Sequence, residues 1–162
     1  MHVYKTKHPV AHSADDMFAL VADVESYPKF LPLCEELTLQ SREQREGKEV
    51  LVATIVVGYK LIRESFTTEV IRDAEARTIL VHYLDGPFAF LENRWQFTPI
   101  TAEDCEVDFY IGYSFRSRML ERLMGGLFAT AVRRYTAAFE KRADAIYGTR
   151  ARARLTITRR GG

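Results

Sequence analysis

The chain has 162 residues, 47% of them hydrophobic, and a formal net charge of +1. This length is enough for one well-buried domain and too short for two. No apolar run reaches the roughly 18 residues of a membrane-spanning helix, and the first residues lack the apolar core of a secretory signal, so we expect a soluble, cytoplasmic protein. Cys34 and Cys105 lack the spacing of a zinc site or a disulfide framework, so reduced, buried thiols are expected.

The small net charge hides an uneven distribution along the chain. Residues 116–162 hold 12 Lys or Arg against 3 Asp or Glu, a balance of +9, whereas residues 1–115 hold 11 basic and 19 acidic residues, a balance of −8. The segment 149–162 is especially basic, and we expect it to be a disordered tail beyond a single domain that spans 1–148. Such a tail could also contact phosphates or anionic lipids.

The first part of the chain predicts a strand followed by short helices. Residues 3–10 mix β-branched and polar side chains, as a strand does. Ser13, with Asp16 three positions later, is typical of a helix N-cap, and an apolar helical face follows. In the stretch 27–34, Pro28 and Pro32 prevent a regular helix or a central strand. We expect a second short helical turn and a stiff loop there, whose apolar side chains either pack inward or form an exposed cavity lip.

Between residues 34 and 115 the hydrophobic period is two. Turn residues at 45–47, 59–60 and 73–76 divide the first part of this region, and further alternating runs follow. The run 105–115 is the clearest, because apolar residues occupy every second position. The pattern predicts six strands in an antiparallel meander, or seven with the first strand.

The stretch 117–147 predicts one long amphipathic helix, about 45 Å long at ~1.5 Å per residue. Its apolar stripe comprises Leu120, Leu123, Met124, Leu127, Phe128, Ala131, Tyr135, Ala138, Phe139 and Ile146. Gly125 and Gly126 weaken the helix by ~1 kcal/mol each relative to Ala, which indicates a bend or a close contact. We interpret the half around these glycines as a movable wall and the later half as a fixed anchor.

These elements predict an α+β fold. An antiparallel sheet with one apolar face needs a cover, and the long C-terminal helix is the only predicted element of sufficient size. We therefore expect a curved seven-stranded antiparallel sheet wrapped around that helix, with two short helices after the first strand. A curved sheet cannot contact a straight helix everywhere, so an apolar cavity is expected between them.

Four stretches carry a family resemblance. They are YPKFLPLC at 27–34, VGY at 57–59, the GPF turn at 86–88 with the alternating residues of 91–97, and the strand 107–115. Together with the element order, they resemble the coenzyme Q-binding proteins of mitochondria and bacteria, within the START-like or helix-grip group that includes polyketide cyclases and dehydrases. The resemblance covers roughly residues 3–147. Bacterial relatives of this family include ribosome association toxins, and the sequence does not separate the two groups.

The resemblance implies a non-catalytic carrier or chaperone. Such a protein would bind ubiquinone, or another polyprenyl lipid, without a covalent cofactor or a metal. It would support respiratory electron transport and would contact a membrane transiently, as a peripheral protein of the inner membrane.

A quinone with a prenyl tail is largely apolar, so a tunnel with a few polar groups suffices to bind it. Strand alternation, the helical stripe and the proline loop give the candidate ligand-binding residues, with Val81 and Ile111 nominated beside them. The candidates are Phe30, Leu31, Pro32, Leu33, Val57, Phe66, Val70, Tyr83, Trp95, Phe97, Phe109, Tyr113, Met124, Leu127, Phe128 and Ala131. Residue by residue, ordinary core packing is the favoured explanation, and only the whole set favours a cavity.

Two other functions remain open. A ribosome-binding, toxin-like protein would use the basic C-terminal part of the chain, whereas no binding to DNA is expected. A polyketide cyclase or aromatase would need a carboxylate or a histidine in the cavity with a perturbed pKa. The four histidines are scattered, and no nucleophile motif or phosphate-binding loop occurs, so no catalytic residue is predicted.

Overall fold

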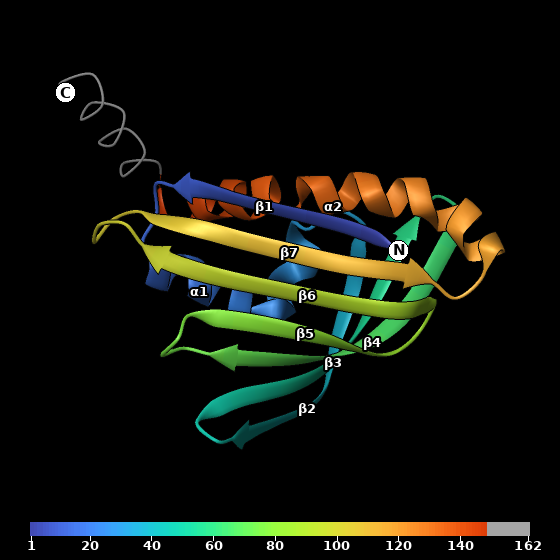
Figure 1. The fold of residues 1–162 in the computed structure, drawn as a ribbon, viewed down its shortest axis with the longest axis horizontal. Helices are drawn as coiled ribbons and strands as arrows, with labels where there is room; N and C mark the ends of the chain where they lie inside the picture. Colours follow the sequence, from blue (N-terminus) through green and yellow to red (C-terminus); the bar gives the residue numbers. More distant parts are fainter. Residues whose placement is uncertain (149–162) are drawn as a thin grey trace.

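The structure is a computed structural model that describes residues 1–148; the basic tail predicted at 149–162 lies outside the described residues. One strand and two short helices precede six further strands and a long helix (Figure 1). In chain order the elements are β1 (His2–Val10), α1 (Ala14–Ala22), the 3₁₀ helix η1 (Val24–Lys29), β2 (Cys34–Arg45), β3 (Lys48–Tyr59), β4 (Ile62–Asp73), β5 (Thr78–Asp85), β6 (Phe88–Pro99), β7 (Cys105–Phe115) and α2 (Arg118–Tyr147).

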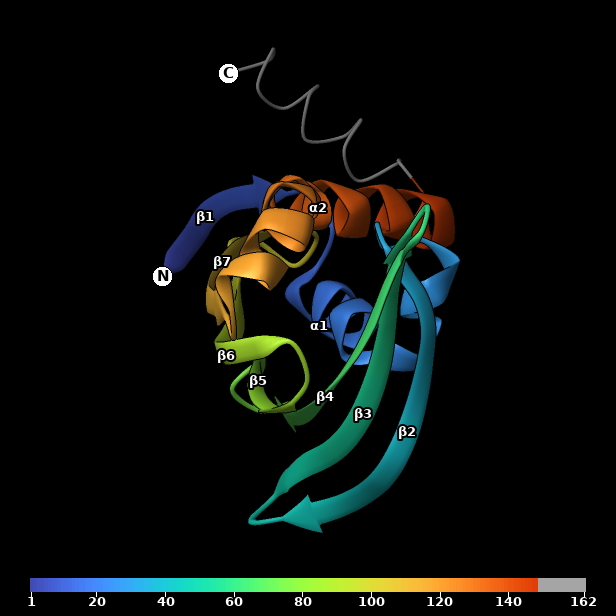
Figure 2. The same ribbon diagram turned by 90° about the vertical axis from the view of Figure 1, so that its right-hand side faces the viewer.

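The strands form one seven-stranded sheet in the order β1-β7-β6-β5-β4-β3-β2, with antiparallel neighbours throughout. Figure 2 shows the sheet curving like a hook, with α2 across its open side. Register shifts at Cys34/Glu36 and Leu39/Ser41 mark irregularities in β2 that favour this curvature. The predicted α+β class and the helix-grip arrangement are confirmed.

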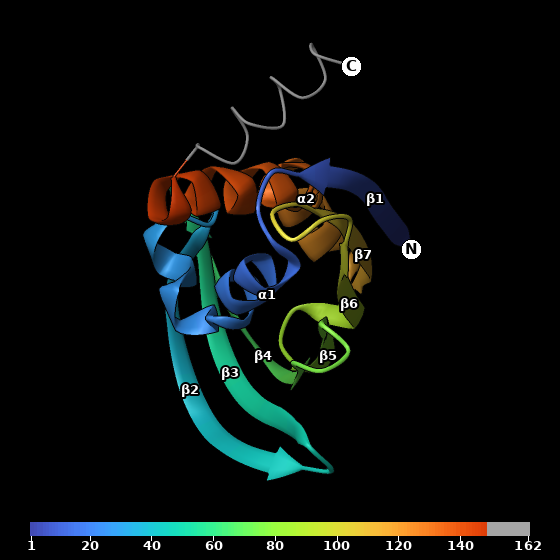
Figure 3. The same cartoon turned by 90° about the vertical axis from the view of Figure 1, so that its left-hand side faces the viewer.

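Both α-helices begin where side-chain caps place them. The Ser13 hydroxyl accepts a hydrogen bond from the Asp16 backbone N–H at 3.1 Å, and the Ser117 hydroxyl accepts one from the Leu120 N–H at 3.2 Å. These bonds satisfy donors that the first turn leaves free. Helix α1 lies on the concave side of the sheet, near the end of the molecule where α2 finishes (Figure 3). It closes that end of the space between α2 and the sheet.

The proline loop packs inward, which decides between the two arrangements considered from the sequence. The Phe30 ring lies 5.2 Å from the Phe139 ring of α2, and the Tyr27 ring lies 5.3 Å from the same ring. The Tyr27 hydroxyl donates a hydrogen bond to the Val21 carbonyl, which ties the loop to the end of α1. The loop therefore packs against the core, with Phe30, Leu31 and Leu33 half-buried.

The predicted apolar stripe of α2 is wrong at two positions. Leu123 is 54% exposed and Ile146 is 49% exposed, although most of the stripe is buried or half-buried. Both residues lie near the ends of the helix, and its first turns reach past the edge of the sheet (Figure 1). Cys34 and Cys105 are free and buried, as expected.

Candidate functional site

A mainly apolar cavity of about 90 Å³ lies between the concave face of the sheet, the proline loop and α2. Strands β2 to β7 supply most of its wall, because their inward residues alternate with outward polar ones. The lining residues are Val24, Tyr27, Leu31, Pro32, Cys34, Leu37, Ala53, Ile55, Val57, Phe66, Thr68, Val70, Val81, Leu91, Asn93, Trp95, Phe109, Ile111, Phe128, Tyr135 and Phe139.

Aromatic contacts hold the cavity walls in place. At one end Trp95, the only tryptophan of the chain, lies 4.6 Å from Phe109 and 5.1 Å from Phe139, measured between ring centroids. At the other end Phe128 of α2 lies 4.7 Å from Tyr113. Edge-to-face pairs of this kind stabilise by about 0.5–1.5 kcal/mol each beyond the area they bury. Two aromatic clusters therefore fix α2 to the sheet on either side of the cavity.

Thr68 is the unusual polar residue of the lining. Its side chain points from β4 to the concave face, it is 1% exposed, and its hydroxyl has no hydrogen-bond partner among the described residues. Asn93, by contrast, is well bonded: its amide donates to the Tyr110 carbonyl at 2.9 Å and accepts from the Trp95 indole N–H at 2.9 Å. A buried hydroxyl without a partner costs about 1–3 kcal/mol. The Thr68 hydroxyl is thus an unused hydrogen-bonding group within apolar surroundings.

The titratable groups in the lining are neutral at physiological pH. Burial raises the pKa of the Cys34 thiol to about 11. Burial also raises the pKa of the Tyr27 and Tyr135 hydroxyls above its ordinary value. These groups therefore keep their protons, and the thiol is not activated as a nucleophile.

The cavity is too small for a quinone ring as it stands. A void of ~150 Å³ is what holds a single benzene molecule, so a substituted ring requires the walls to move apart. A small pocket of about 10 Å³ adjoins the cavity and shares Val57 and Phe128 with it. Its other walls are Leu33, the end of the β3–β4 hairpin and residues of α2. The small pocket therefore extends from the cavity toward the β3–β4 hairpin and the first half of α2.

The first half of α2 contains features that weaken the helix. Gly126 is exposed, and a Cβ atom there would meet nothing within 4 Å, so no tight contact requires a glycine. The Thr130 hydroxyl donates to the Gly126 carbonyl at 2.9 Å, a bond that competes with the helical ladder and bends helices. A Cβ on Gly125 would collide with the flexible end of the Glu121 side chain. Two glycines and a side chain bonded to the backbone thus lie together in the half interpreted as the movable wall, and its movement stays a prediction.

The structure brings half of the sequence-predicted residues together. Those in the cavity lining are Leu31, Pro32, Val57, Phe66, Val70, Trp95, Phe109 and Phe128, with the nominated Val81 and Ile111. Leu33, Met124 and Leu127 line the small adjoining pocket instead.

The other predicted residues do not line the cavity. Phe97 is stacked behind Trp95 and covered by Phe18 of α1, with ring centroids 6.3 Å apart. The remainder pack around the cavity: Phe30 against Phe139, Tyr83 against Phe88, Tyr113 against Phe128, and Ala131 in the buried face of α2.

Several lining residues are not among the predicted ones, although the sequence pattern indicates that some of them face inward. Thr68 shares its period-two face with Phe66 and Val70, so alternation alone places it inside. Asn93 lies within the quoted stretch 91–97. Tyr135 and Phe139 were placed on the helical stripe, in the half interpreted as an anchor. Only the packing shows that this half also closes the cavity.

Within residues 1–148, no group of three or more His, Cys, Asp or Glu side chains is placed to hold a metal ion. No helix in this part of the chain is both long enough and apolar enough to span a bilayer.

Comparison with known proteins places the chain in a family. Residues 10–140 match the family described as polyketide cyclase / dehydrase and lipid transport. The ribosome association toxin RatA of Escherichia coli is 33% identical over 141 residues, covering 87% of this chain and 86% of RatA. Coenzyme Q-binding protein COQ10 homolog B of Xenopus laevis is 30% identical over 151 residues, covering 90% of this chain and 59% of that protein.

Solved structures agree with this assignment. The 18 kDa protein CC1736 of Caulobacter crescentus is 33% identical, with a TM-score of 0.73 over 91% of this chain and 99% of that one. The Zhui aromatase/cyclase of Streptomyces sp. R1128 is 18% identical, with a TM-score of 0.72 over 88% of this chain and 94% of that one, a likeness that concerns the fold alone. The chain belongs to the polyketide cyclase/dehydrase and lipid transport family, with a START-like fold.

Proposed function

We propose that the protein binds ubiquinone or a similar polyprenyl lipid in the cavity between the sheet and α2, and carries it for respiratory electron transport. The observation that carries this proposal is an apolar cavity with a fully buried, unpartnered hydroxyl, that of Thr68. A quinone offers the matching chemistry, since its ring oxygens accept hydrogen bonds and its tail is hydrocarbon. The similarity to COQ10 homolog B supports the same ligand class.

The orientation of the ligand follows from the position of Thr68. This residue pairs with Ala53 of β3 and Tyr83 of β5, in the middle of the sheet and beneath the cavity. In the proposed complex a quinone oxygen accepts the Thr68 O–H, and the tail leaves between the β3–β4 hairpin and the first half of α2. The neutral hydroxyl, amide and thiol groups of the lining support binding better than acid–base cyclisation, which needs a group that exchanges protons near neutral pH.

Trp95 provides a direct test. As the only tryptophan, and a lining residue, it should lose fluorescence when a quinone enters the cavity. Short-chain and long-chain quinones should both quench it in a saturable way. Ala53→Leu fills the cavity and should abolish saturable quenching, whereas Ala89→Leu, the same change at an exposed position of β6, should leave it intact. Equal quenching in wild type and Ala53→Leu contradicts the proposal.

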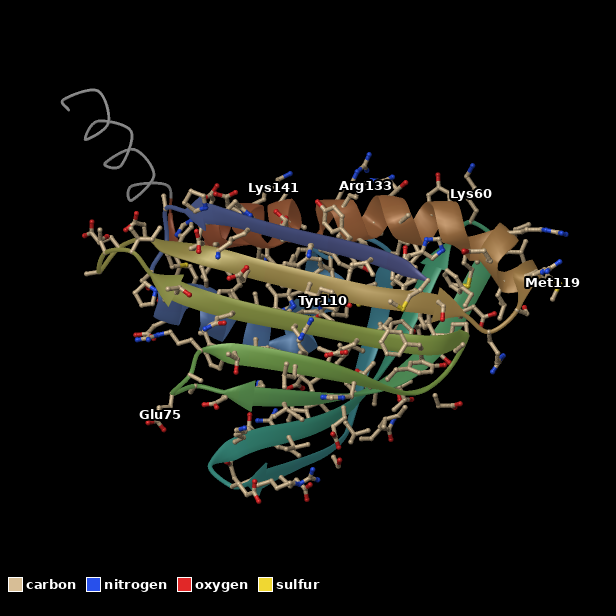
Figure 4. The ribbon with its side chains drawn as sticks, in the orientation of Figure 1. Lys60, Glu75, Tyr110, Met119, Arg133 and Lys141 are labelled. Carbon is tan, nitrogen blue, oxygen red and sulfur yellow. The ribbon has the colours of Figure 1, made fainter. Side chains whose placement is uncertain are left out.

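A second function, ribosome binding, is favoured by a separate surface. An open groove of about 550 Å³ lies on the outer face of the sheet, away from the cavity. There the Arg94 guanidinium lies 4.2 Å from the centre of the Tyr110 ring, with Lys5 and Lys7 beside them, and Tyr110 projects from this face in Figure 4. Basic side chains around an aromatic ring suit single-stranded RNA. The similarity to RatA supports this alternative.

The ribosome alternative predicts salt-sensitive cosedimentation with ribosomal subunits. The double variant Arg94→Gln/Tyr110→Ala should reduce it strongly, and removal of residues 149–162 measures the contribution of the basic tail. Cosedimentation that neither change affects counts against this function for the outer groove.

A further inference from the structure

One end of the molecule exposes apolar side chains from two different elements. Leu61, at the tip of the β3–β4 hairpin, is 100% exposed and Tyr59 beside it is also exposed. On the first turns of α2, Met119 and Leu123 are 65% and 54% exposed. We call these four residues the end patch. Figure 4 shows Lys60 and Met119 near the same end of the molecule, with Glu75 at the opposite end.

The two halves of the end patch are joined through the small pocket beside the cavity. Met119, Leu123 and Leu127 follow one another at intervals of four, so they lie on one side of the helix. Leu127 and Tyr59 both line the small pocket, which shares Val57 and Phe128 with the cavity. The end patch therefore borders the small pocket, through Tyr59 and through the side of α2 that Leu127 shares with Met119 and Leu123.

Basic residues accompany the end patch. Residues 116–134 contain five arginines and one acidic residue, Glu121, whose carboxylate contacts His2. Arg118 and Arg122 are exposed, flank Met119 and Leu123 in sequence, and form no ion pair within the described residues. Lys60 lies at the hairpin tip, 5.3 Å from the centre of the Tyr59 ring. Exposed leucines bordered by cations match a bilayer, which offers hydrocarbon beneath anionic head groups.

We propose that the end patch docks on the surface of an anionic phospholipid bilayer, with Leu61 and Leu123 inserted among the acyl chains and Arg118, Arg122 and Lys60 on the head groups. The inserted residues belong to the hairpin and to the helix half that border the cavity mouth. Docking therefore holds the mouth against the lipid, where a hydrophobic ligand can pass without entering water. This last step rests on the proposed lipid-carrier function, whereas the docking itself does not.

The test uses the full chain and phospholipid vesicles that contain no quinone. Wild-type protein should cosediment with phosphatidylcholine vesicles that contain phosphatidylglycerol, and more weakly with pure phosphatidylcholine. Leu61→Asn should lower the vesicle affinity about tenfold or more, because a leucine side chain no longer enters hydrocarbon. Arg118→Gln and Arg122→Gln should each lower affinity about fivefold for the anionic vesicles only.

The matched control is Ile100→Asn. Ile100 is 54% exposed, as Leu123 is, but it lies in the turn after β6, at the opposite end of the antiparallel meander from the β3–β4 hairpin. This variant should bind vesicles as the wild type does. All variants should keep the wild-type melting temperature, since the altered side chains are exposed.

Three results would overturn the docking proposal: unchanged vesicle binding in Leu61→Asn, an equal loss in Ile100→Asn, or a Leu61→Asn defect seen with ribosomal subunits and not with vesicles. Quinone titration by Trp95 fluorescence in vesicle-free solution separates the two proposals. Leu61→Asn should retain full quenching there, so a failure of docking and a failure of quinone binding give different results.

Discussion

Replacing Thr68 by Val should make the empty protein more stable and the quinone complex weaker. The two side chains have nearly the same shape, so the change removes the hydroxyl without opening a void. Since that hydroxyl is buried without a partner, its removal should raise the free energy of unfolding by about 1–3 kcal/mol. For a chain of this length, this corresponds to a melting temperature higher by roughly 2–12 °C.

The same change should reduce quinone affinity, because a ring oxygen loses its hydrogen-bond donor inside an apolar cavity. A loss of about 1.4 kcal/mol in binding free energy corresponds to a tenfold higher dissociation constant, a difference that Trp95 quenching resolves. A polyprenyl hydrocarbon without ring oxygens should bind wild type and Thr68→Val equally. This difference between ligands distinguishes a positioning role from a general change in packing.

The neighbouring residue provides the control. The Thr67 hydroxyl lies on the outer face of the sheet, 2.9 Å from the Thr54 hydroxyl. Thr67→Val breaks that bond and should lower stability slightly or leave it unchanged, with no effect on quinone affinity. The reasoning about Thr68 is refuted if Thr68→Val lowers the melting temperature, or if it raises stability while quinone affinity stays the same.

Three further predictions concern helix α2, the two buried thiols and the contact between His12 and Asp144. Gly126→Ala should stabilise the protein by about 1 kcal/mol in urea unfolding but slow quinone uptake in stopped-flow fluorescence, and faster uptake would contradict a flexing helix. Burial raises the pKa of Cys34 to about 11 and that of Cys105 to about 12, from an ordinary value of 9.0. Because the folded state holds these protons more tightly than the unfolded state does, the stability should fall as the pH rises above 9.0. A Cys34→Ala/Cys105→Ala variant should show a shallower fall in melting temperature over this pH range. The His12 side chain is buried, and its ring nitrogen lies 2.7 Å from an Asp144 carboxylate oxygen. His12→Ala should therefore lower the free energy of unfolding, measured in urea, by about 1.5–3 kcal/mol. A change smaller than the error of the fit would show that this contact is not stabilising.

The sequence by itself determined the order and type of the elements. Alternation is a local property, and it gave the bounds of the strand 105–115 as the structure has them, because every second side chain there is buried. The Ser13 and Ser117 caps are equally local, since each serine bonds a backbone N–H three residues away. The packing of the long helix against the sheet also followed from the sequence, because each element has an apolar face that must be buried.

The size and polarity of the cavity depended on contacts between distant residues. The curvature of the sheet and the positions of Phe128 and Phe139 over it decide which inward residues line the cavity. No local sequence pattern encodes the curvature or these positions. The inward packing of the proline loop and the exposure of Leu123 are also tertiary. A periodic stripe records which side of a helix is apolar, whereas its burial depends on whether another element reaches it. Only the folded chain could show that Leu61 and the start of α2 expose apolar side chains near the small pocket, whose wall also includes Leu33 of the proline loop.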